Sequence, residues 1–495
     1  MYHPSLEEFK HKSKSGNLIP VYREILADME TPVSAFQKID DHRHSFLLES
    51  MEGGEKWARY SFLGSRPSVV VKSKGRIVEV TREGKTEKRS FEQDPLEAVK
   101  DILSAYQPVP DQMLPRFFGG AVGFMSYDVV RYFEDLPNRE KGGLDIPDVF
   151  FMITDTLVIF DNLTHKLKVV SNAHVQGRSI TAAYKEAIAK IDEIVKKLKQ
   201  GKNSKFKIQN SKRKAKGLSL KSNFTQPQYE QAVLKAKEYI KAGDIFQVVP
   251  SQRFEAKIKA EPYEIYRALR LINPSPYMYF LRCGATTIVG ASPEVMVRLE
   301  GGKIDLRPIA GTRKRGTTEE EDKALADELL ADPKERAEHI MLVDLGRNDV
   351  GRVSEAGSVK VSELMVIERY SHVMHIVSNV RGRLSQGKDS YDVIRACFPA
   401  GTVSGAPKIR AMEIIDELEP TQRGPYAGAV GYFGFSGNMD TCITIRTLVV
   451  KDNTAYIQAG GGVVADSDPA AEYQETVNKA KAMMRAVEMA EQGLD

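Results

Sequence analysis

Two pairs of glutamates with the same spacing are the residues of this sequence whose chemistry stands out. Glu335 and Glu338 lie three residues apart, as do Glu472 and Glu475, and Lys479 follows four residues later. Residues three and four apart share one face of an α-helix, so each pair presents two carboxylates on one side. Two such helices facing each other would offer oxygen ligands of the kind that Mg²⁺ prefers. Two helices with ordinary surface salt bridges are the alternative that spacing alone leaves open.

A triplet of glycines, 460–462, precedes the second pair. It follows an apolar run, 454–459, that is typical of a strand. Asp468 can cap a helix there, and Pro469 suits the first helical turn. We therefore expect a glycine loop, with free backbone N–H groups, to lie beside the carboxylates.

Other candidate binding residues lie in runs that are too small or too apolar for ordinary surface loops. The loop at 398–408 lacks the spacing of a nucleotide P-loop, which argues against ATP, whereas the loop at 308–316 could hold an anion. We expect Arg446 in the middle of a strand, where its charge needs an anionic partner. His372 and His375 lie in an apolar run, where a purely structural histidine is the common alternative. Together these residues indicate a site for a small molecule with two carboxylates, one held by a divalent metal.

The elements that must position these residues do not alternate as βαβ units. Helical periodicity predicts helices at 180–198, 226–242, 262–272 and 335–345, the last of them largely buried, among many short strands. We therefore expect an α+β fold with large antiparallel sheets. Gly-Ala-Val-Gly occurs twice, at 120–123 and 428–431, which is compatible with two similar halves facing each other.

A basic segment divides the chain. Residues 196–223 contain eleven Lys and Arg residues and no Asp or Glu, and removing these from the net charge of +4 leaves −7 elsewhere. Such a segment without apolar periodicity is typical of a flexible linker. We expect an N-terminal part at 1–195, the linker at 196–223 and a C-terminal part at 224–495. An RNA-binding regulator that uses the linker is a remote alternative, because no aromatic platform accompanies the charges.

Composition indicates a globular protein without membrane spans. The chain has 495 residues, 42% of them hydrophobic and 28% charged. No apolar run approaches the roughly 18 residues that a membrane span needs, and the first residues show no secretory signal. Cys283, Cys397 and Cys442 form no CxxC motif, which fits packing thiols in a reducing cytoplasm.

At these residues the chain resembles the chorismate-utilising enzymes, and among them the large subunits of anthranilate synthases. The similarity covers nearly the whole length and is densest between about Thr225 and Arg485. The motifs that carry it are long and specific: Gly-Ala-Ser-Pro-Glu294, Pro-Ile-Ala-Gly-Thr312, Glu338-His-Ile-Met-Leu-Val-Asp-Leu, Phe-Pro-Ala-Gly-Thr-Val-Ser-Gly-Ala-Pro-Lys408 and the Gly460–Lys479 stretch. The resemblance implies two interlocked subdomains, with the sheets packed as a sandwich and the helices outside.

The resemblance also implies the site residues. Mg²⁺ would be held by Glu338 and Glu475, with Glu335 and Glu472 nearby or joined through water. The candidate proton donors are His375, Thr402 and Glu294. Chorismate would be contacted by Gly311, Thr312, Tyr426, Arg446, Gly460, Gly461, Gly462 and Lys479.

Two positions distinguish the members of this family. Isochorismate and salicylate synthases carry a water-activating lysine where this chain has Gln247, and a neutral amide is a poor base. Aminodeoxychorismate synthases typically carry a nucleophilic lysine where this chain has Ala310, and alanine cannot attack the ring. Both differences favour ammonia as the nucleophile and anthranilate as the product of a magnesium-dependent lyase. Aminodeoxychorismate synthase component I, of the folate pathway, is the alternative within the family.

The resemblance further implies feedback control by L-tryptophan. The segments 47–50 and 273–278 match the family's inhibitor site, set between the two parts of the chain. Glu49 or Ser50 would meet the ligand's ammonium group, and Tyr277 and Met278, next to Pro276, would flank its indole. None of the cysteines lies in a nucleophile elbow, so ammonia should come from a separate glutamine amidotransferase subunit, in a cytoplasmic heterotetramer.

Overall fold

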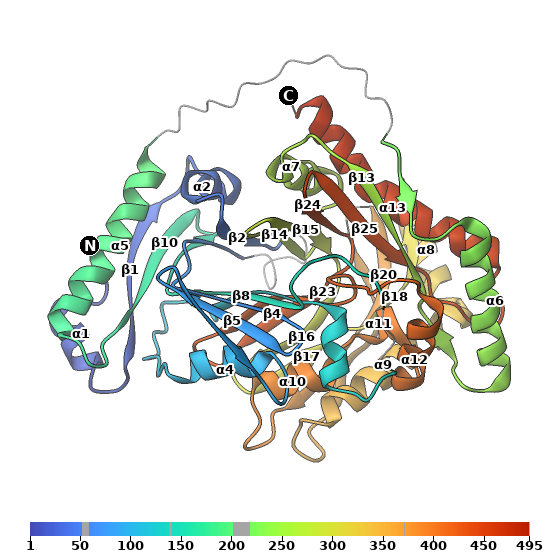
Figure 1. Cartoon of the computed structure of the whole chain (residues 1–495), viewed down its shortest axis with the longest axis horizontal. Coiled ribbons are helices and arrows are strands. Elements are labelled where there is room, and N and C mark those ends of the chain that lie inside the picture. The colour runs from blue at the N-terminus through green and yellow to red at the C-terminus, as the bar shows by residue number, and fades with distance from the viewer. Residues whose placement is uncertain (52–58, 138–140, 201–217, 371, 495) are drawn as a thin grey trace.

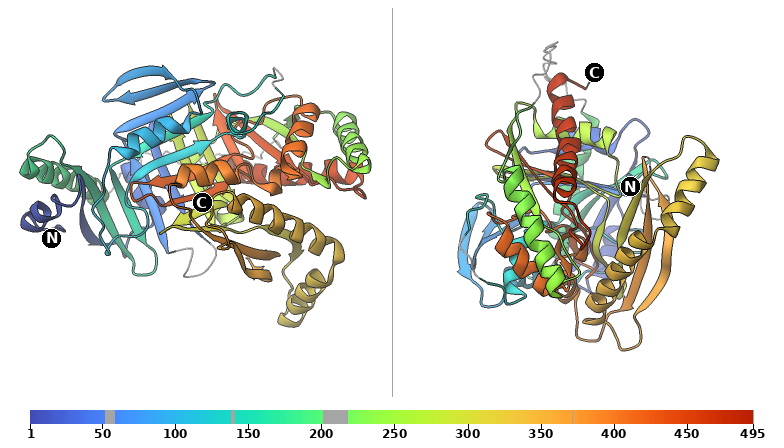
Figure 2. Two further views of the ribbon diagram at one scale, coloured as in Figure 1. Left: turned by 90° about the horizontal axis from the view of Figure 1, so that it is seen from below. Right: turned by 90° about the vertical axis from the view of Figure 1, so that its right-hand side faces the viewer.

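Two large antiparallel sheets form the centre of the molecule, and each is built from both ends of the chain (Figure 1). The computed structural model describes residues 1–51, 59–137, 141–200, 218–370 and 372–494. In Figure 1 the N-terminal helices lie on the left and the long C-terminal helix on the right, and Figure 2 shows the same layers from two other sides. The expected α+β fold with helices outside large antiparallel sheets is confirmed.

The first sheet has 11 strands in the described residues. Five N-terminal strands occupy one end and six C-terminal strands the other, and they meet where β2 pairs with β14. From edge to edge its strands are β1 (Leu18–Leu26), β10 (Lys166–His174), β9 (Thr156–Asp161), β3 (Tyr60–Ser65), β2 (His44–Glu49), β14 (Tyr277–Cys283), β15 (Thr286–Ser292), β24 (Thr447–Lys451), β25 (Thr454–Gly460), β13 (Ser251–Lys257) and β11 (Lys221–Ser222).

The second sheet has 12 strands in the described part of the chain, and it joins the two ends where β7 pairs with β22. Its strands are β18 (Ile309–Lys314), β20 (Val373–Arg383), β17 (Lys303–Leu306), β16 (Val295–Glu300), β23 (Met439–Ile443), β22 (Ala429–Gly434), β7 (Gly120–Met125), β8 (Val149–Thr154), β4 (Val69–Lys74), β5 (Ile77–Arg82) and β6 (Lys85–Ser90), with β19 (Lys360–Arg369) also on β20. A short pair, β12 (Gln247–Val248) with β21 (Gly405–Ala406), lies apart.

The repeated Gly-Ala-Val-Gly motifs lie at the junction of the second sheet. Gly123 of β7 is opposite Gly431 of β22. A Cβ atom would lie 1.9 Å from the Phe150 carbonyl oxygen at the first glycine and 2.1 Å from the Asp440 carbonyl oxygen at the second. The motif therefore recurs where neighbouring backbones leave no room for a side chain.

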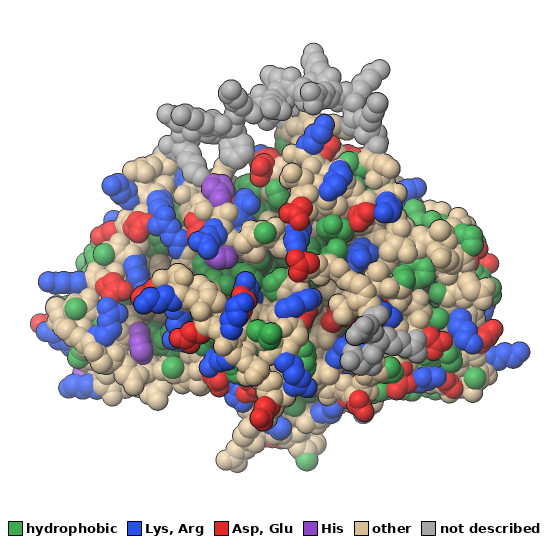
Figure 3. Space-filling model, in the orientation of Figure 1, with side chains coloured by type: hydrophobic (Ala, Val, Ile, Leu, Met, Phe, Trp, Pro, Cys, Tyr) green, Lys and Arg blue, Asp and Glu red, His purple; other side chains and the backbone are tan. Residues whose placement is uncertain are grey.

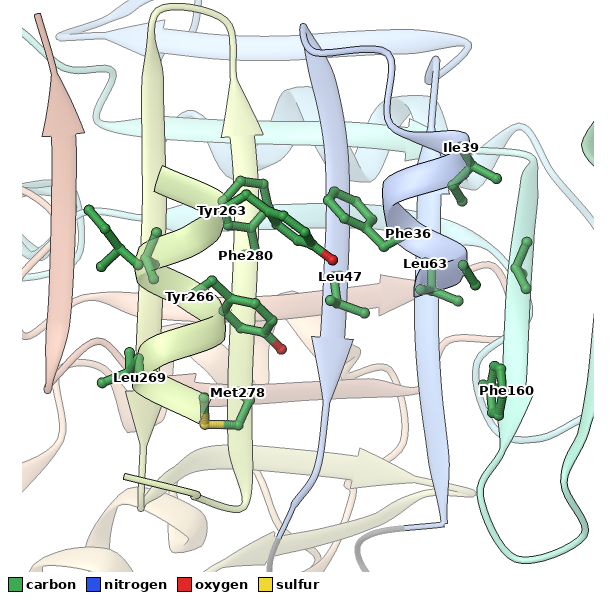
Figure 4. Packing of buried hydrophobic residues seen from close by; sticks show 14 of the residues in the cluster. Phe36, Ile39, Leu47, Leu63, Phe160, Tyr263, Tyr266, Leu269, Met278 and Phe280 are labelled. Carbon is green, nitrogen blue, oxygen red and sulfur yellow. The ribbon is translucent and has the colours of Figure 1, made fainter. Parts of the chain in front are cut away.

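Aromatic and branched side chains from both sheets fill the space between them. This cluster draws Phe46 and Leu281 from the first sheet and Phe124, Phe150 and Val430 from the second. A larger cluster lies on the outer face of the first sheet, where helices α2 and α7 pack on β2 and β14 (Figure 4). The interlocked sandwich follows, because neither end of the chain completes a sheet by itself.

The helices cover the outer faces and the ends of the sheets. The predicted bounds of 226–242 and 262–272 agree with α6 and α7, whose starts carry a proline in the first turn. The helices are α1 (Leu6–Lys12), α2 (Pro32–Ile39), α4 (Leu96–Ser104), α5 (Ile180–Lys199), α6 (Gln226–Ala242), α7 (Pro262–Ile272), α8 (Glu319–Ala331), α9 (Pro333–Gly351), α10 (Ser390–Cys397), α11 (Gly401–Ser404), α12 (Lys408–Leu418) and α13 (Pro469–Gln492).

Three local expectations need correction. The segment expected as an anion-binding loop is β18, a strand that pairs with β20 and bulges at Gly311, where φ is +68°. Helix α9 is buried along one side only, because Ile340 is 40% exposed. The first residues of the basic segment continue α5 to Lys199, and residues 221–222 form β11, whereas 201–217 lie outside the described residues.

Charged side chains do not gather into a patch of one sign on the face in Figure 3. Positive and negative side chains are interspersed there. Among the described helices, none is long and apolar enough to cross a membrane. The three cysteines are buried and free, as expected for packing thiols.

Candidate functional site

A cavity of about 300 Å³ brings most of the predicted site residues together. Its walls come from both sheets, from α9 and α13, and from the segment around α11. Gly461, Glu335 and Glu472 lie just behind this lining. The predicted residues that line the cavity are Glu294, Gly311, Thr312, Glu338, His375, Thr402, Tyr426, Arg446, Gly460, Gly462, Glu475 and Lys479.

Helices α9 and α13 carry the two glutamate pairs, and both begin in the same way. The Asp332 side chain caps α9 and the Asp468 side chain caps α13, each followed by a proline. Glu338 accepts a hydrogen bond from Gln247 Nε2 at 3.0 Å. Burial, together with the charges of Glu335 and Glu475, raises the pKa of the Glu338 carboxyl. The carboxylates thus converge closely enough to repel one another.

The second pair is only partly satisfied by the protein. Glu472 Oε1 accepts from Ser467 Oγ at 2.7 Å, while its buried Oε2 has no hydrogen-bond partner among the described residues. Burial raises the pKa of the Glu472 carboxyl, and the charge of Glu475 adds to this effect. Glu475 forms an ion pair with Lys479 at 2.6 Å. A cation between the pairs would reduce the repulsion between the carboxylates, and it could bind the Glu472 oxygen that has no hydrogen-bond partner among the described residues.

The donor set limits which metal could bind. No group of three or more His, Cys, Asp or Glu residues is close enough to hold a metal in the part of the chain that the structure describes. Mg²⁺ needs only one or two carboxylates, because water and substrate oxygens complete its shell. Glu338 and Glu475, which line the cavity, fit this ion rather than zinc.

Neighbouring side chains leave little room for a Cβ atom in the glycine triplet. A Cβ atom at Gly461 would lie 2.7 Å from Glu472 Oε2, and one at Gly462 would lie 2.5 Å from Gln247 Nε2. The expected loop of free N–H groups needs one correction, because the N–H of Gly461 donates to the Pro250 carbonyl at 3.3 Å.

Glu294 is the most enclosed of the candidate proton donors in the cavity. It is 5% exposed, and Thr402 Oγ1 donates to its Oε1 at 2.7 Å. Burial raises the pKa of Glu294 to about 8, so the carboxyl keeps its proton at neutral pH. His375 differs, because burial lowers its pKa and its Nδ1 lies 2.8 Å from the Gly311 carbonyl oxygen. His375 is therefore a neutral imidazole that borders the site.

Arg446 was expected in the middle of a strand, but it lies between β23 and β24. Its φ of 49° turns the chain there. It lines the cavity and also an adjoining one of about 400 Å³, which contains His372. Its positive charge, together with that of Lys479 at the mouth, suits a substrate with carboxylates.

A separate cavity contains the predicted inhibitor residues, between β2 and β3 of the N-terminal part and β14 and β22 of the C-terminal part. Ser50, Pro276 and Tyr277 line it together with Glu49 and Met278. The roles expected for the last two side chains need correction. The carboxylate of Glu49 accepts from Tyr266 and is bound by Arg270, both on α7, and the Met278 side chain packs on the same helix (Figure 4). Only their backbones can face a ligand.

The sequence analysis did not predict the three charged residues that line this cavity, Arg116, Arg298 and Asp440. Asp440 accepts from the Tyr277 hydroxyl at 2.8 Å and pairs with Arg298 at 2.8 Å and Arg116 at 3.0 Å. Arg298 and Asp440 lie within apolar strands, and a charge in such a run is a signal that could have marked them.

Comparison with known proteins agrees with this geometry. The sequence pattern of the family described as chorismate binding enzyme matches residues 45–485. The chain belongs to the chorismate binding enzyme family. It is 50% identical over 493 residues to anthranilate synthase component 1 of Acetivibrio thermocellus, covering 99% of each chain. With the protein of the same name from Aquifex aeolicus it shares 51% over 490 residues, covering 99% of this chain and 98% of the relative.

A solved structure of a family member shows the same fold. The crystal structure of anthranilate synthase component I from Streptococcus pneumoniae is 38% identical, with a TM-score of 0.76, and the match covers 93% of this chain and 99% of that one. The recognition of the chorismate-utilising family and of its anthranilate synthase branch is confirmed. The two positions that distinguish family members, Gln247 and Ala310, both line the main cavity.

Proposed function

We propose that this protein is the large subunit of an anthranilate synthase. It converts chorismate and ammonia to anthranilate and pyruvate, the first step of L-tryptophan biosynthesis. The observation that carries this proposal is the full-length identity of about one half to proteins of that name. The cavity supports it, because Gln247 and Ala310 stand where other chorismate chemistries need a lysine.

Different residues of the cavity are proposed to bind Mg²⁺ and chorismate. Glu338 and Glu475 would hold Mg²⁺, with Glu335 and Glu472 behind them, and the ion would supply positive charge to offset a substrate carboxylate. Arg446 and Lys479 add positive charge. The remaining contacts to chorismate come from Gly311, Thr312, Tyr426, Gly460, Gly461 and Gly462.

Proton transfer falls to Glu294. Ammonia adds to the ring, and the ring hydroxyl needs a proton to leave as water. The protonated Glu294 carboxyl supplies it, and Thr402 holds that carboxyl in place at 2.7 Å. His375 forms part of the cavity wall, where its neutral imidazole ring can form hydrogen bonds. Pyruvate is then eliminated from the adduct, which leaves anthranilate.

Two partners complete the proposal. A glutamine amidotransferase subunit supplies ammonia within a cytoplasmic heterotetramer. L-Tryptophan binds the second cavity as a feedback inhibitor and contacts Ser50, Pro276 and Tyr277 together with the backbones at 49 and 278. The charged side chains of Arg116, Arg298 and Asp440 suit an amino acid, which carries a positive and a negative charge.

Product identification tests the proposal. The purified chain, incubated with chorismate, ammonium and Mg²⁺, should produce fluorescent anthranilate and an equal amount of pyruvate. Isochorismate as the product would contradict it, and so would 4-amino-4-deoxychorismate, the intermediate of the alternative in the folate pathway.

A further inference from the structure

A deeply buried ion pair lies behind the wall of the main cavity. Glu419 and Arg423 follow α12, and their side chains are 3% and 1% exposed. Arg423 Nη2 and Nε donate to the Glu419 carboxylate at 2.6 and 3.0 Å. Desolvation offsets much of the attraction in such a pair, so it contributes little to stability by itself. Its remaining contacts include three residues that line the cavity.

The guanidinium of Arg423 binds two backbone segments at once. Its Nη1 donates to the Val403 carbonyl at 2.7 Å and its Nη2 to the Val249 carbonyl at 2.6 Å. Both valines line the cavity. Val403 lies in the one-turn helix α11, whose carbonyls lack partners within so short a helix. Arg423 therefore supplies a donor that α11 cannot supply for itself.

The carboxylate of Glu419 extends the same network to β25. Its Oε1 accepts from the N–H and the hydroxyl of Ser251 at 2.8 and 2.7 Å. The Ser251 hydroxyl accepts in turn from Gln458 Nε2 at 2.8 Å. Gln458 lines the cavity two residues before Gly460, so the ion pair also fixes the strand that carries the glycine triplet.

Two aromatic rings complete the contacts. The Arg423 guanidinium lies 5.5 Å from the centre of the Tyr426 ring and 4.7 Å from that of the Tyr127 ring. Tyr426 lines the cavity, and its hydroxyl lies beside Gly460.

We propose that Arg423, held by Glu419, is a positioning residue for chorismate in this cavity. Its guanidinium ties together α11, the β12–β13 segment, Tyr426 and, through Glu419, β25. The residue before Val403 is Thr402, which orients Glu294. Arg423 thereby sets the geometry of the proton donor without touching substrate, and the role rests on the proposed function.

Only arginine can make these contacts. Its fork spans two carbonyls and a carboxylate in fixed directions, whereas a lysine ammonium is a compact point charge. Arg423→Lys therefore keeps the buried charge but loses the geometry. Arg282→Lys is the matched control, because Arg282 binds Asp40 at 3.0 Å in another well-buried pair that lines neither cavity.

The experiment compares these variants in the full chain. We expect Arg423→Lys to raise KM for chorismate or lower kcat by about 10- to 100-fold, with far-UV circular dichroism and melting temperature changed no more than in Arg282→Lys. Calorimetric titration with chorismate and Mg²⁺, without ammonium, should show correspondingly weaker binding. Added guanidinium ions should partly restore turnover to Arg423→Ala and not to Arg282→Ala.

The outcomes separate this inference from the proposed function. Failure of the wild-type chain to produce anthranilate would contradict the proposed function, and the titration would still test whether Arg423 shapes the cavity. An active wild type with kcat, KM and binding unchanged in Arg423→Lys would overturn the positioning role. If Arg423→Lys does not fold, Glu419→Gln, which keeps the shape of the side chain, should show the same kinetic loss, and wild-type kinetics in it would overturn the role.

Discussion

At the scale of single residues, the environment of each carboxyl decides what it can do. Glu294 is enclosed and keeps its proton, whereas Glu338 and Glu472 face like charges in the proposed metal site. The same type of side chain can thus serve as a proton donor in one environment and as a cation ligand in another.

The metal assignment predicts the behaviour of Glu338→Gln. Replacing the carboxylate by an amide of the same shape removes a ligand charge but leaves the packing of α9 intact. We expect at least about a 100-fold loss of turnover, together with weaker Mg²⁺ binding by calorimetric titration. Glu328→Gln on α8, whose side chain is 61% exposed, is the control and should bind Mg²⁺ like the wild type. Unchanged Mg²⁺ binding in Glu338→Gln would remove Glu338 from the site.

The buried acid predicts a pH dependence. Because burial raises the pKa of Glu294 to about 8, turnover at constant free ammonia should fall as pH rises past that value. Glu294→Gln cannot donate a proton and should lose about 10²- to 10⁴-fold of kcat. The raised pKa also favours the folded state at low pH, and this contribution is lost as pH rises from the ordinary glutamate range through about 8.

Two measurements check this assignment. The melting temperature of the wild type should fall relative to that of Glu294→Gln between pH 5 and pH 9, because only the wild type has a carboxyl here that ionises more readily in the unfolded chain than in the folded one. A pH profile of kcat that is flat through pH 8 in the wild type would show that another group donates the proton.

At the scale of elements, local signals were predictable from the sequence and long-range pairing was not. A proline marks the start of α7, and a capping Asp468 with a proline marks that of α13, so their positions followed from a few neighbouring residues. Strand β18 was mistaken for a loop because its glycine and basic residues resemble one, and only its pairing with β20 makes it a strand. Arg446 was misplaced because apolar residues on both sides hide the turn between β23 and β24.

The crowding around Gly460, the last residue of β25, predicts that only glycine fits at this position. A Cβ atom at Gly460 would lie 2.8 Å from both the Pro250 carbonyl oxygen and the Tyr426 hydroxyl. The carbonyl belongs to the backbone and cannot move aside cheaply, so Gly460→Ala should cost about 1–3 kcal/mol of stability and raise KM for chorismate. Gly351→Ala at the end of α9, with no atom within 4 Å of its Cβ, is the control. KM in Gly460→Ala within twofold of the control would contradict the close contact.

At the scale of the whole molecule, the two cavities differ in how they depend on the junctions between the two ends of the chain. The second cavity takes Leu48 and Tyr60 from the N-terminal part and Tyr279 and Tyr432 from the C-terminal part. The residues that line the main cavity all belong to the C-terminal part. Sequence motifs marked residues of both cavities, but Arg116 and Asp440 come together only through the pairing of sheets, which no local pattern reveals.

A ligand in the second cavity therefore binds both parts of the chain, and this predicts how L-tryptophan acts. It should stabilise the fold by RT ln(1 + [L]/Kd), about 2.7 kcal/mol at one hundred times Kd, and inhibit turnover. Ser50→Leu fills the cavity beside Tyr277 and should raise the tryptophan concentration for half inhibition by at least about 10-fold, with turnover in its absence unchanged. Ser45→Ala on β2, the strand that ends just before Ser50, is the control, because the Ser45 hydroxyl donates to Asp40 and lies outside the cavity. Inhibition and thermal stabilisation that persist unchanged in Ser50→Leu would place the inhibitor elsewhere.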